Sequence, residues 1–139
     1  KDGSPKFFEF NIESTGCMSS KTIFKRACKY LIKKCDKIIT YFNENNEYKI
    51  IIHDDSIKNY KLITLKDENH TIGNILKQEL SEIKEVFFSG YTMPHPHIEE
   101  IVIRLGTESN HKDLCILALE NIKSKTKKIL DDFENQLNK

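Results

Sequence analysis

The sequence predicts an α+β protein in which two long helices and one short helix pack on a small, mostly antiparallel sheet. Two stretches repeat a mainly apolar residue every three or four positions, which is the period of a helix with one buried face. These residues are Phe24, Cys28, Leu31, Cys35, Ile38 and Phe42 in the first stretch, and Cys115, Leu119, Ile122, Thr126, Ile129 and Phe133 in the second. Between them lie short β-rich runs that are typical of strands.

The first third of the chain is predicted to form a strand, a turn and a long helix. Residues 7–12 alternate apolar and polar side chains as a strand does. A turn containing Gly16 follows, and Ser19 or Ser20 suits the N-cap of a helix that runs to about Phe42. The polar run NENNE at 43–47 then ends the helix.

The remaining two thirds of the chain are predicted to hold the sheet. Residues 48–53 and 60–66 are rich in β-formers and are separated by turn residues, which indicates a hairpin. A short amphipathic helix at 72–83 comes next, with Asn69 or Thr71 as its cap. Further elements are then expected in the order strand 86–91, an irregular proline-containing segment at 93–97, strand 101–105, and a long helix to about residue 137.

A weak internal repeat indicates how the chain is organised. A strand, the pair Glu-Ser and a long helix occur at 7–42 and again at 101–137. Only the second copy is preceded by a hairpin, a short helix and a strand. We therefore expect the first unit to lack its front part and the sequence to be a piece of a longer protein, which agrees with its starting on a residue other than Met.

Composition excludes several classes of protein. The 139 residues suffice for one ordinary domain, and 22 Lys and Arg residues balance 21 acidic ones. A dedicated nucleic-acid binder usually has a basic excess. No run of apolar residues approaches the length of a membrane span. The four cysteines form no Cys-x-x-Cys pair, and Cys28, Cys35 and Cys115 fall on apolar helix positions, which predicts buried thiols in a reducing compartment.

Residue types that carry chemistry are present but form no recognisable site. Gly73 has neither the glycine spacing nor the lysine of a phosphate loop, and we expect it to permit close approach of a neighbouring backbone. The acid pairs at 54–55 and 131–132 and the lysines at 123–128 are expected on the surface. We expect no catalytic residue, no cofactor and no metal in this chain. The alternative hypothesis is a small metal-binding or enzymatic domain that uses His95 and His97, although the acidic ligands that would support such a site are absent.

Three segments carry a specific resemblance. They are HTIGNIL at 70–76, VFFSGYTMPHP at 86–96 and IVIRLGT at 101–107. In this order and spacing they resemble the small alpha-like subunit of cellular RNA polymerases, which is the eleventh subunit of polymerase II and has an archaeal counterpart. The resemblance covers about residues 47–137. Asn69 stands where the family commonly has an acid, which weakens the expectation of a charged contact there, and Ile72 replaces the usual leucine.

The N-terminal part carries a shorter resemblance. Residues 6–43, with Ile12, Glu13, Ser14 and Gly16 at their centre, resemble the C-terminal end of the large alpha-like subunit, which is the third subunit of polymerase II and also has an archaeal counterpart. The whole chain is therefore similar to a fusion of the kind found in large DNA viruses. Residues 1–43 would be the terminal strand and helix of a large alpha-like unit, and 44–139 a small alpha-like dimerisation unit.

The resemblance implies a structural role. A subunit of this kind pairs two alpha-like units and docks the second-largest polymerase subunit and small assembly subunits, with DNA contacted only indirectly and no membrane involved. It would be intracellular, in the host cytoplasm and virion if viral and in the nucleus if cellular. The residues expected to pack between the units are Phe24, Leu31, Ile38, Leu119, Ile122 and Phe133. Those expected to dock other subunits are His70, Thr71, Ile72, Gly73, Asn74, Gly90, Tyr91, Pro94, His95 and Pro96.

Overall fold

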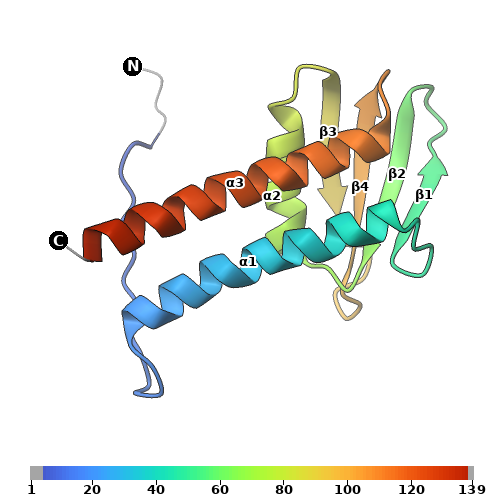
Figure 1. Cartoon of the computed structure of the whole chain (residues 1–139). Helices are drawn as coiled ribbons and strands as arrows, with labels where there is room; N and C mark the ends of the chain where they lie inside the picture. The colour runs from blue at the N-terminus through green and yellow to red at the C-terminus, as the bar shows by residue number, and fades with distance from the viewer. Residues whose placement is uncertain (1–4, 138–139) are drawn as a thin grey trace.

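All three helices lie on one face of a four-stranded sheet (Figure 1). This arrangement comes from a computed structural model, which describes residues 5–137. In chain order the elements are α1 (Ser20–Asn43), β1 (Ile50–Asp54), β2 (Tyr60–Lys66), α2 (His70–Ser81), β3 (Val86–Thr92), β4 (Glu100–Thr107) and α3 (His111–Leu137). The strand order is β1-β2-β4-β3 and every pairing is antiparallel. The predicted α+β fold, with two long helices and one short helix, is confirmed.

Each helix begins at a polar cap that the sequence provides. The Ser19 hydroxyl accepts a hydrogen bond from the Thr22 N–H at 3.2 Å and caps α1. The Asn110 side chain does the same for α3, accepting from the Lys112 N–H at 2.9 Å. Such caps satisfy main-chain N–H groups that have no partner within the helix. The predicted start of α1 at Ser19 or Ser20 is therefore confirmed.

The core lies between the sheet and the helices. Alternate residues of the two central strands point toward the helices, as the period of two requires. Fully buried in this layer are Ile63, Leu65, Ile101, Ile103 and Leu105 from the strands, and Cys35, Ile38, Leu76, Leu80, Ala118 and Leu119 from the helices. Burying each large apolar side chain is worth about 1.5–3 kcal/mol. Because α1 supplies Cys35 and Ile38, it is part of the same core as the sheet.

Three of the cysteines are buried, as predicted from their helix positions. Cys28, Cys35 and Cys115 lie inside, and Cys17 is exposed; all four are free thiols. Burial raises the pKa of Cys35 to about 11 and the pKa of Cys115 to about 12. Because the thiolate is the reactive form, these two side chains act as small apolar residues.

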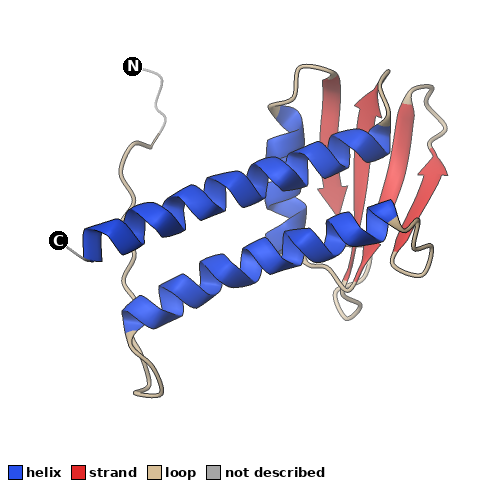
Figure 2. Ribbon diagram, in the orientation of Figure 1, coloured by secondary structure: helices blue, strands red, loops and turns tan. Residues whose placement is uncertain are grey.

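The strand predicted at residues 7–12 is wrong for this chain. The segment is an irregular loop, with Phe7, Phe8 and Phe10 exposed to 84%, 68% and 73%. It runs past the far ends of α1 and α3, away from the sheet (Figure 2). A strand needs the N–H and C=O groups of a neighbouring strand, and none lies next to this segment among residues 5–137. Residues 7–12 therefore have no strand to pair with in this part of the chain, although their side chains alternate.

Two smaller predictions also need correction. Strand β1 begins at Ile50, because the N–H groups of Lys49 and Ile50 close a turn on the Asn46 carbonyl, and Tyr48 is 87% exposed. Asp55 was expected on the surface, yet its side chain is only 8% exposed, since Arg104 Nε donates to its Oδ2 at 2.5 Å. Within residues 5–137, no helix is long and apolar enough to cross a membrane.

The two long helices extend beyond the sheet (Figure 1). Where α1 begins and α3 ends, the rings of Phe24 and Phe133 lie 4.5 Å apart between centroids. The ion pair between Lys25 Nζ and Glu134 Oε1 at 2.8 Å joins the same ends. The first half of α1 and the last half of α3 therefore contact each other in a region where neither helix packs on the sheet.

Candidate docking site

The predicted docking residues gather at one end of the sheet, where β2 and β3 end and β4 begins. We call residues 67–74 the docking turn. Its N–H at Asp67 donates to the Glu99 carbonyl at 2.7 Å, which joins the turn to the end of the proline-containing loop at 93–99. Asn69 is the cap of α2, because its side-chain oxygen accepts from the Thr71 N–H at 3.1 Å. Of the two predicted caps, Asn69 is confirmed and Thr71 is wrong.

Gly73 allows α2 to lie close to β3. A Cβ at this position would be 2.5 Å from Cδ2 of Tyr91, far inside van der Waals contact. The Tyr91 hydroxyl is also hydrogen-bonded to Nδ1 of His70, 3.2 Å away. The sequence predicted close approach of a neighbouring backbone at Gly73. The approaching group is instead the side chain of Tyr91, which joins the two predicted docking segments.

The predicted docking residues divide by exposure into two groups. Ile72 and Gly73 are buried, and Gly90 and Tyr91 are half-buried, so these four position the surface. The residues that present side chains to solvent are His70, Thr71, Asn74, Pro94, His95 and Pro96. Across the described range 5–137, no three His, Cys, Asp or Glu side chains are placed to hold a metal ion. His95 and His97, the residues of the alternative hypothesis, therefore have no third metal ligand beside them among the described residues.

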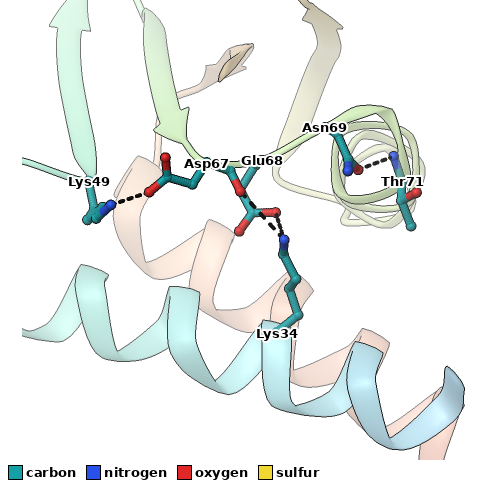
Figure 3. A network of polar contacts seen from close by, with 6 residues as sticks. All are labelled: Lys34, Lys49, Asp67, Glu68, Asn69 and Thr71. Carbon is teal, nitrogen blue, oxygen red and sulfur yellow. Dashed lines mark hydrogen bonds and ion pairs between the residues drawn. The ribbon is translucent and has the colours of Figure 1, made fainter. Parts of the chain in front are cut away.

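A charged network that the sequence did not predict lies between α1 and the docking turn (Figure 3). Lys34 Nζ, from α1, is 3.1 Å from Glu68 Oε2 and also points at the Asp67 carbonyl, 3.5 Å away. Lys49 forms an ion pair with the Asp67 carboxylate. The network fastens the first long helix to the start of the short one. No local pattern marks it, because Lys34 and Glu68 are far apart in the sequence.

The pKa values of the two adjacent acids in this network are shifted in opposite directions. Glu68 is 5% exposed, and burial raises the pKa of its carboxyl although Lys34 opposes this effect. Burial by itself lowers the pKa of Lys34, but its hydrogen bond and charge interaction with Glu68 outweigh that and leave the pKa raised. At exposed Asp67, the hydrogen bond from Lys49 lowers the pKa.

Neutralising Glu68 and Asp67 separately is expected to give opposite pH dependences. The folded pKa of Glu68 lies above its ordinary value of 4.5, so its contribution to stability is greatest below pH 4.5 and is lost as pH rises through the folded pKa. The folded pKa of Asp67 lies below its ordinary value of 3.8. Its contribution is present above pH 3.8 and is lost as pH falls through the folded pKa.

Urea unfolding of wild type, Glu68→Gln and Asp67→Asn between pH 2.5 and 8 measures this difference. Relative to Glu68→Gln, wild type should become less stable as pH rises from 4.5. Relative to Asp67→Asn, wild type should become less stable as pH falls below 3.8. Three parallel pH curves would show that neither carboxyl has a shifted pKa.

A second surface feature is an apolar groove between the extended halves of the long helices. Its volume is about 790 Å³. We use the name apolar groove for the part lined by Phe8, Phe24, Ala27, Leu31, Ile72 and Ile129. Of the residues predicted to pack between units, Phe24 and Leu31 line it and Phe133 contacts Phe24. The other three, Ile38, Leu119 and Ile122, lie in the core between α1, α3 and the sheet.

Comparison with known proteins agrees with the resemblance found in the sequence. Residues 60–136, more than half of the chain, match the family described as the RNA polymerase Rpb3/Rpb11 dimerisation domain. The DNA-directed RNA polymerase subunit Rpo11 of Saccharolobus solfataricus is 32% identical over 81 residues, which are 57% of this chain and 88% of that subunit. The polymerase II subunit rpb11 of Dictyostelium discoideum is 36% identical over 67 residues, covering 48% of this chain and 56% of that protein.

A viral relative matches a longer part of the chain. The DNA-directed RNA polymerase RPB3-11 homolog of African swine fever virus is 33% identical over 108 residues. The match covers 75% of this chain, so it reaches upstream of residue 60, but only 30% of the viral protein. The name of that relative joins the two subunits that the sequence resembles. By its fold and by these matches, the chain belongs to the Rpb3/Rpb11 dimerisation-domain family of alpha-like RNA polymerase subunits.

Proposed function

We propose that this chain is a non-catalytic assembly part of a multisubunit DNA-dependent RNA polymerase. In this role it pairs two alpha-like units and docks further subunits, while nucleotidyl transfer takes place elsewhere in the complex. The observation that supports it best is the position of α1. This helix comes from the part that resembles the large alpha-like subunit, yet Ile38 and Phe42 lie in the core of the part that resembles the small one.

Pairing of the two units takes place along α1 and α3. The division at residues 43 and 44 puts one long helix in each unit. In the proposed assembly, the rest of the large alpha-like unit covers the apolar groove and the phenylalanines at 7–10. Residues 7–12 then gain the strand partner that they lack here, which would account for their alternating pattern.

Docking of the second-largest subunit takes place at the docking turn and the segment 91–96. The exposed side chains there are polar or rigid, and Gly73, Tyr91 and the charged network hold their main chain in place. Small assembly subunits are the other expected partners, and DNA is contacted only through the complex. The compartment follows from the host: the cytoplasm and virion for a virus, the nucleus for a eukaryotic cell.

Affinity purification of the full-length parent from its native source tests this function. We expect the two largest polymerase subunits to be recovered in amounts roughly equal to the bait. A double variant of the docking turn, Thr71→Ala with Asn74→Ala, should lower recovery of the second-largest subunit at least tenfold. Both side chains are exposed, so circular dichroism should show an unchanged fold. Recovery of the wild-type parent without polymerase subunits would overturn the proposed function.

A further inference from the structure

A small basic pocket lies beside the docking turn, between α1 and the end of β2. Its volume is about 220 Å³. We call it the lysine pocket, because four lysines and two tyrosines line it together with Asp67 and Glu68: Lys33, Lys34, Lys37, Lys66, Tyr30 and Tyr41. Residues 30 to 41 contribute from one side of α1, since their spacing of three and four places them on one helix face.

The pocket holds more positive charge than its own acids neutralise. Glu68 pairs with Lys34, and Asp67 pairs with Lys49 at the edge of the pocket. Lys33, Lys37 and Lys66 form no ion pair with any residue in the range 5–137. Three lysines without an ion-pair partner among the described residues thus line one concave site. An anionic partner would gain a favourable charge interaction with them.

The tyrosines give the pocket a second chemical character. Lys34 Nζ lies 5.8 Å from the centre of the Tyr30 ring, and Lys37 Nζ lies 5.8 Å from that of Tyr41. Contacts of this kind hold ammonium groups over ring faces. Tyr30 is also largely exposed. The pocket therefore offers charge, hydroxyl donors and aromatic surface, a combination suited to peptide side chains with apolar stems.

We propose that the lysine pocket binds an acidic segment of a partner protein that carries at least two neighbouring carboxylates. This inference rests on the proposed function, since it names the chemistry of a contact next to the docking turn. Lys33 and Lys37 are four residues apart on a helix, so their Cβ atoms are about 5–6 Å apart. Carboxylates two residues apart on a strand, about 7 Å, or one helical turn apart match this spacing.

Nucleic acid fits the same pocket less well. A phosphate backbone is usually bound by a long basic surface, whereas this site is a single hollow. The Asp67 carboxylate, which is exposed at its edge, would repel phosphates. The whole chain also carries a formal net charge of only +1. A short acidic peptide can place its carboxylates at the lysines and avoid Asp67.

Carbodiimide crosslinking of the purified native complex tests the inference. The reagent condenses an amine with a nearby carboxylate to an amide, so it reports this contact without a spacer. We expect crosslinks from Lys33, Lys37 or Lys66 to acidic residues of another subunit, at least tenfold more abundant than those from Lys127 and Lys128. These two α3 lysines are exposed and lie outside the pocket, which makes them a matched control.

Charge reversal gives a second readout. In the complex without crosslinker, Lys33→Glu with Lys37→Glu should release the subunit identified by crosslinking at a lower salt concentration than wild type. Lys127→Glu with Lys128→Glu changes the net charge equally and should leave that concentration unchanged. Reversing the partner's acidic residues to lysine should restore the wild-type value.

Several results would overturn the inference. They are an intact complex whose pocket lysines crosslink only within the chain, equal effects of the two double variants, and ultraviolet crosslinks from the pocket to nucleic acid. Absence of polymerase subunits from the purified complex is a different result, because it overturns the proposed function. Carbodiimide crosslinks from the pocket to acidic residues of some other protein would then still support the inference. The absence of such crosslinks would overturn it.

Discussion

Gly73→Ala is expected to destabilise the protein by about 1–2 kcal/mol, although alanine is the better helix former. In a helix interior, replacing glycine by alanine alone contributes about 0.5–1 kcal/mol of stability. Here the new methyl group would stand 2.5 Å from Cδ2 and 2.6 Å from Cε2 of Tyr91. Overpacking of this kind typically costs about 1–3 kcal/mol. Since the ring itself is in the way, α2 or β3 has to shift.

A double-mutant cycle with Tyr91→Ala separates the two effects. Without the ring, the methyl group at position 73 has free space, and only the helix propensity remains. In the Tyr91→Ala background, Gly73→Ala should therefore stabilise the protein by about 0.5–1 kcal/mol. The free energy of unfolding in urea, followed by circular dichroism, measures all four corners of the cycle.

A neighbouring position supplies the control for this cycle. Asn74 follows Gly73 on α2 and is exposed, so Asn74→Ala should not lower stability in either background. The close-packing argument would be wrong if Gly73→Ala raised the stability of otherwise wild-type protein. The cycle also bears on docking, because a shift of α2 would move His70 away from the Tyr91 hydroxyl.

The helices and most strands could be predicted because their signals are local. The stripe from Phe24 to Phe42 and the cap at Ser19 define α1 without reference to the rest of the chain. The same holds for the alternation in β4. The strand predicted at 7–12 failed for the corresponding reason: a pattern records a tendency, but a strand also needs a neighbour. That neighbour is not present in residues 5–137.

The candidate docking site could be predicted only in part. Its position came from the resemblance of residues 70–76 and 86–96, and the structure brings His70 and Tyr91 into hydrogen-bond contact. Which residues of these motifs are buried and which are exposed could not be predicted from the residues alone. Ile72 is buried because it lies on the inner face of α2, so it supports the surface rather than forming it. The lysine pocket was missed because α1 supplies only one side of it, and the end of β2 and the docking turn supply the other.

Phe133→Asp is expected to abolish pairing of the two alpha-like units in the full-length parent while leaving the fold of this chain intact. Phe133 is half-buried and lies 4.5 Å from Phe24, beyond the sheet. In the chain alone, losing this aromatic pair should cost about 1–2 kcal/mol, and the aspartate can remain hydrated. The main core around Ile38 and Leu119 is untouched.

In the assembled parent, the same substitution would place a charge in a closed apolar interface. Burying an unpaired carboxylate costs several kcal/mol, so pairing should weaken by about a hundredfold or more, since each tenfold change is about 1.4 kcal/mol. Co-purification measures this loss when the parent is expressed as two tagged chains divided between residues 43 and 44. Tyr48→Asp, an aromatic-to-acid change at an 87% exposed position, should pair like wild type.

Two results would contradict this prediction. If Phe133→Asp pairs as well as wild type, the interface lies elsewhere. If Phe133→Asp unfolds this chain alone, the ends of α1 and α3 belong to the main core. The packing hypothesis therefore requires both results together, a folded chain and failed pairing.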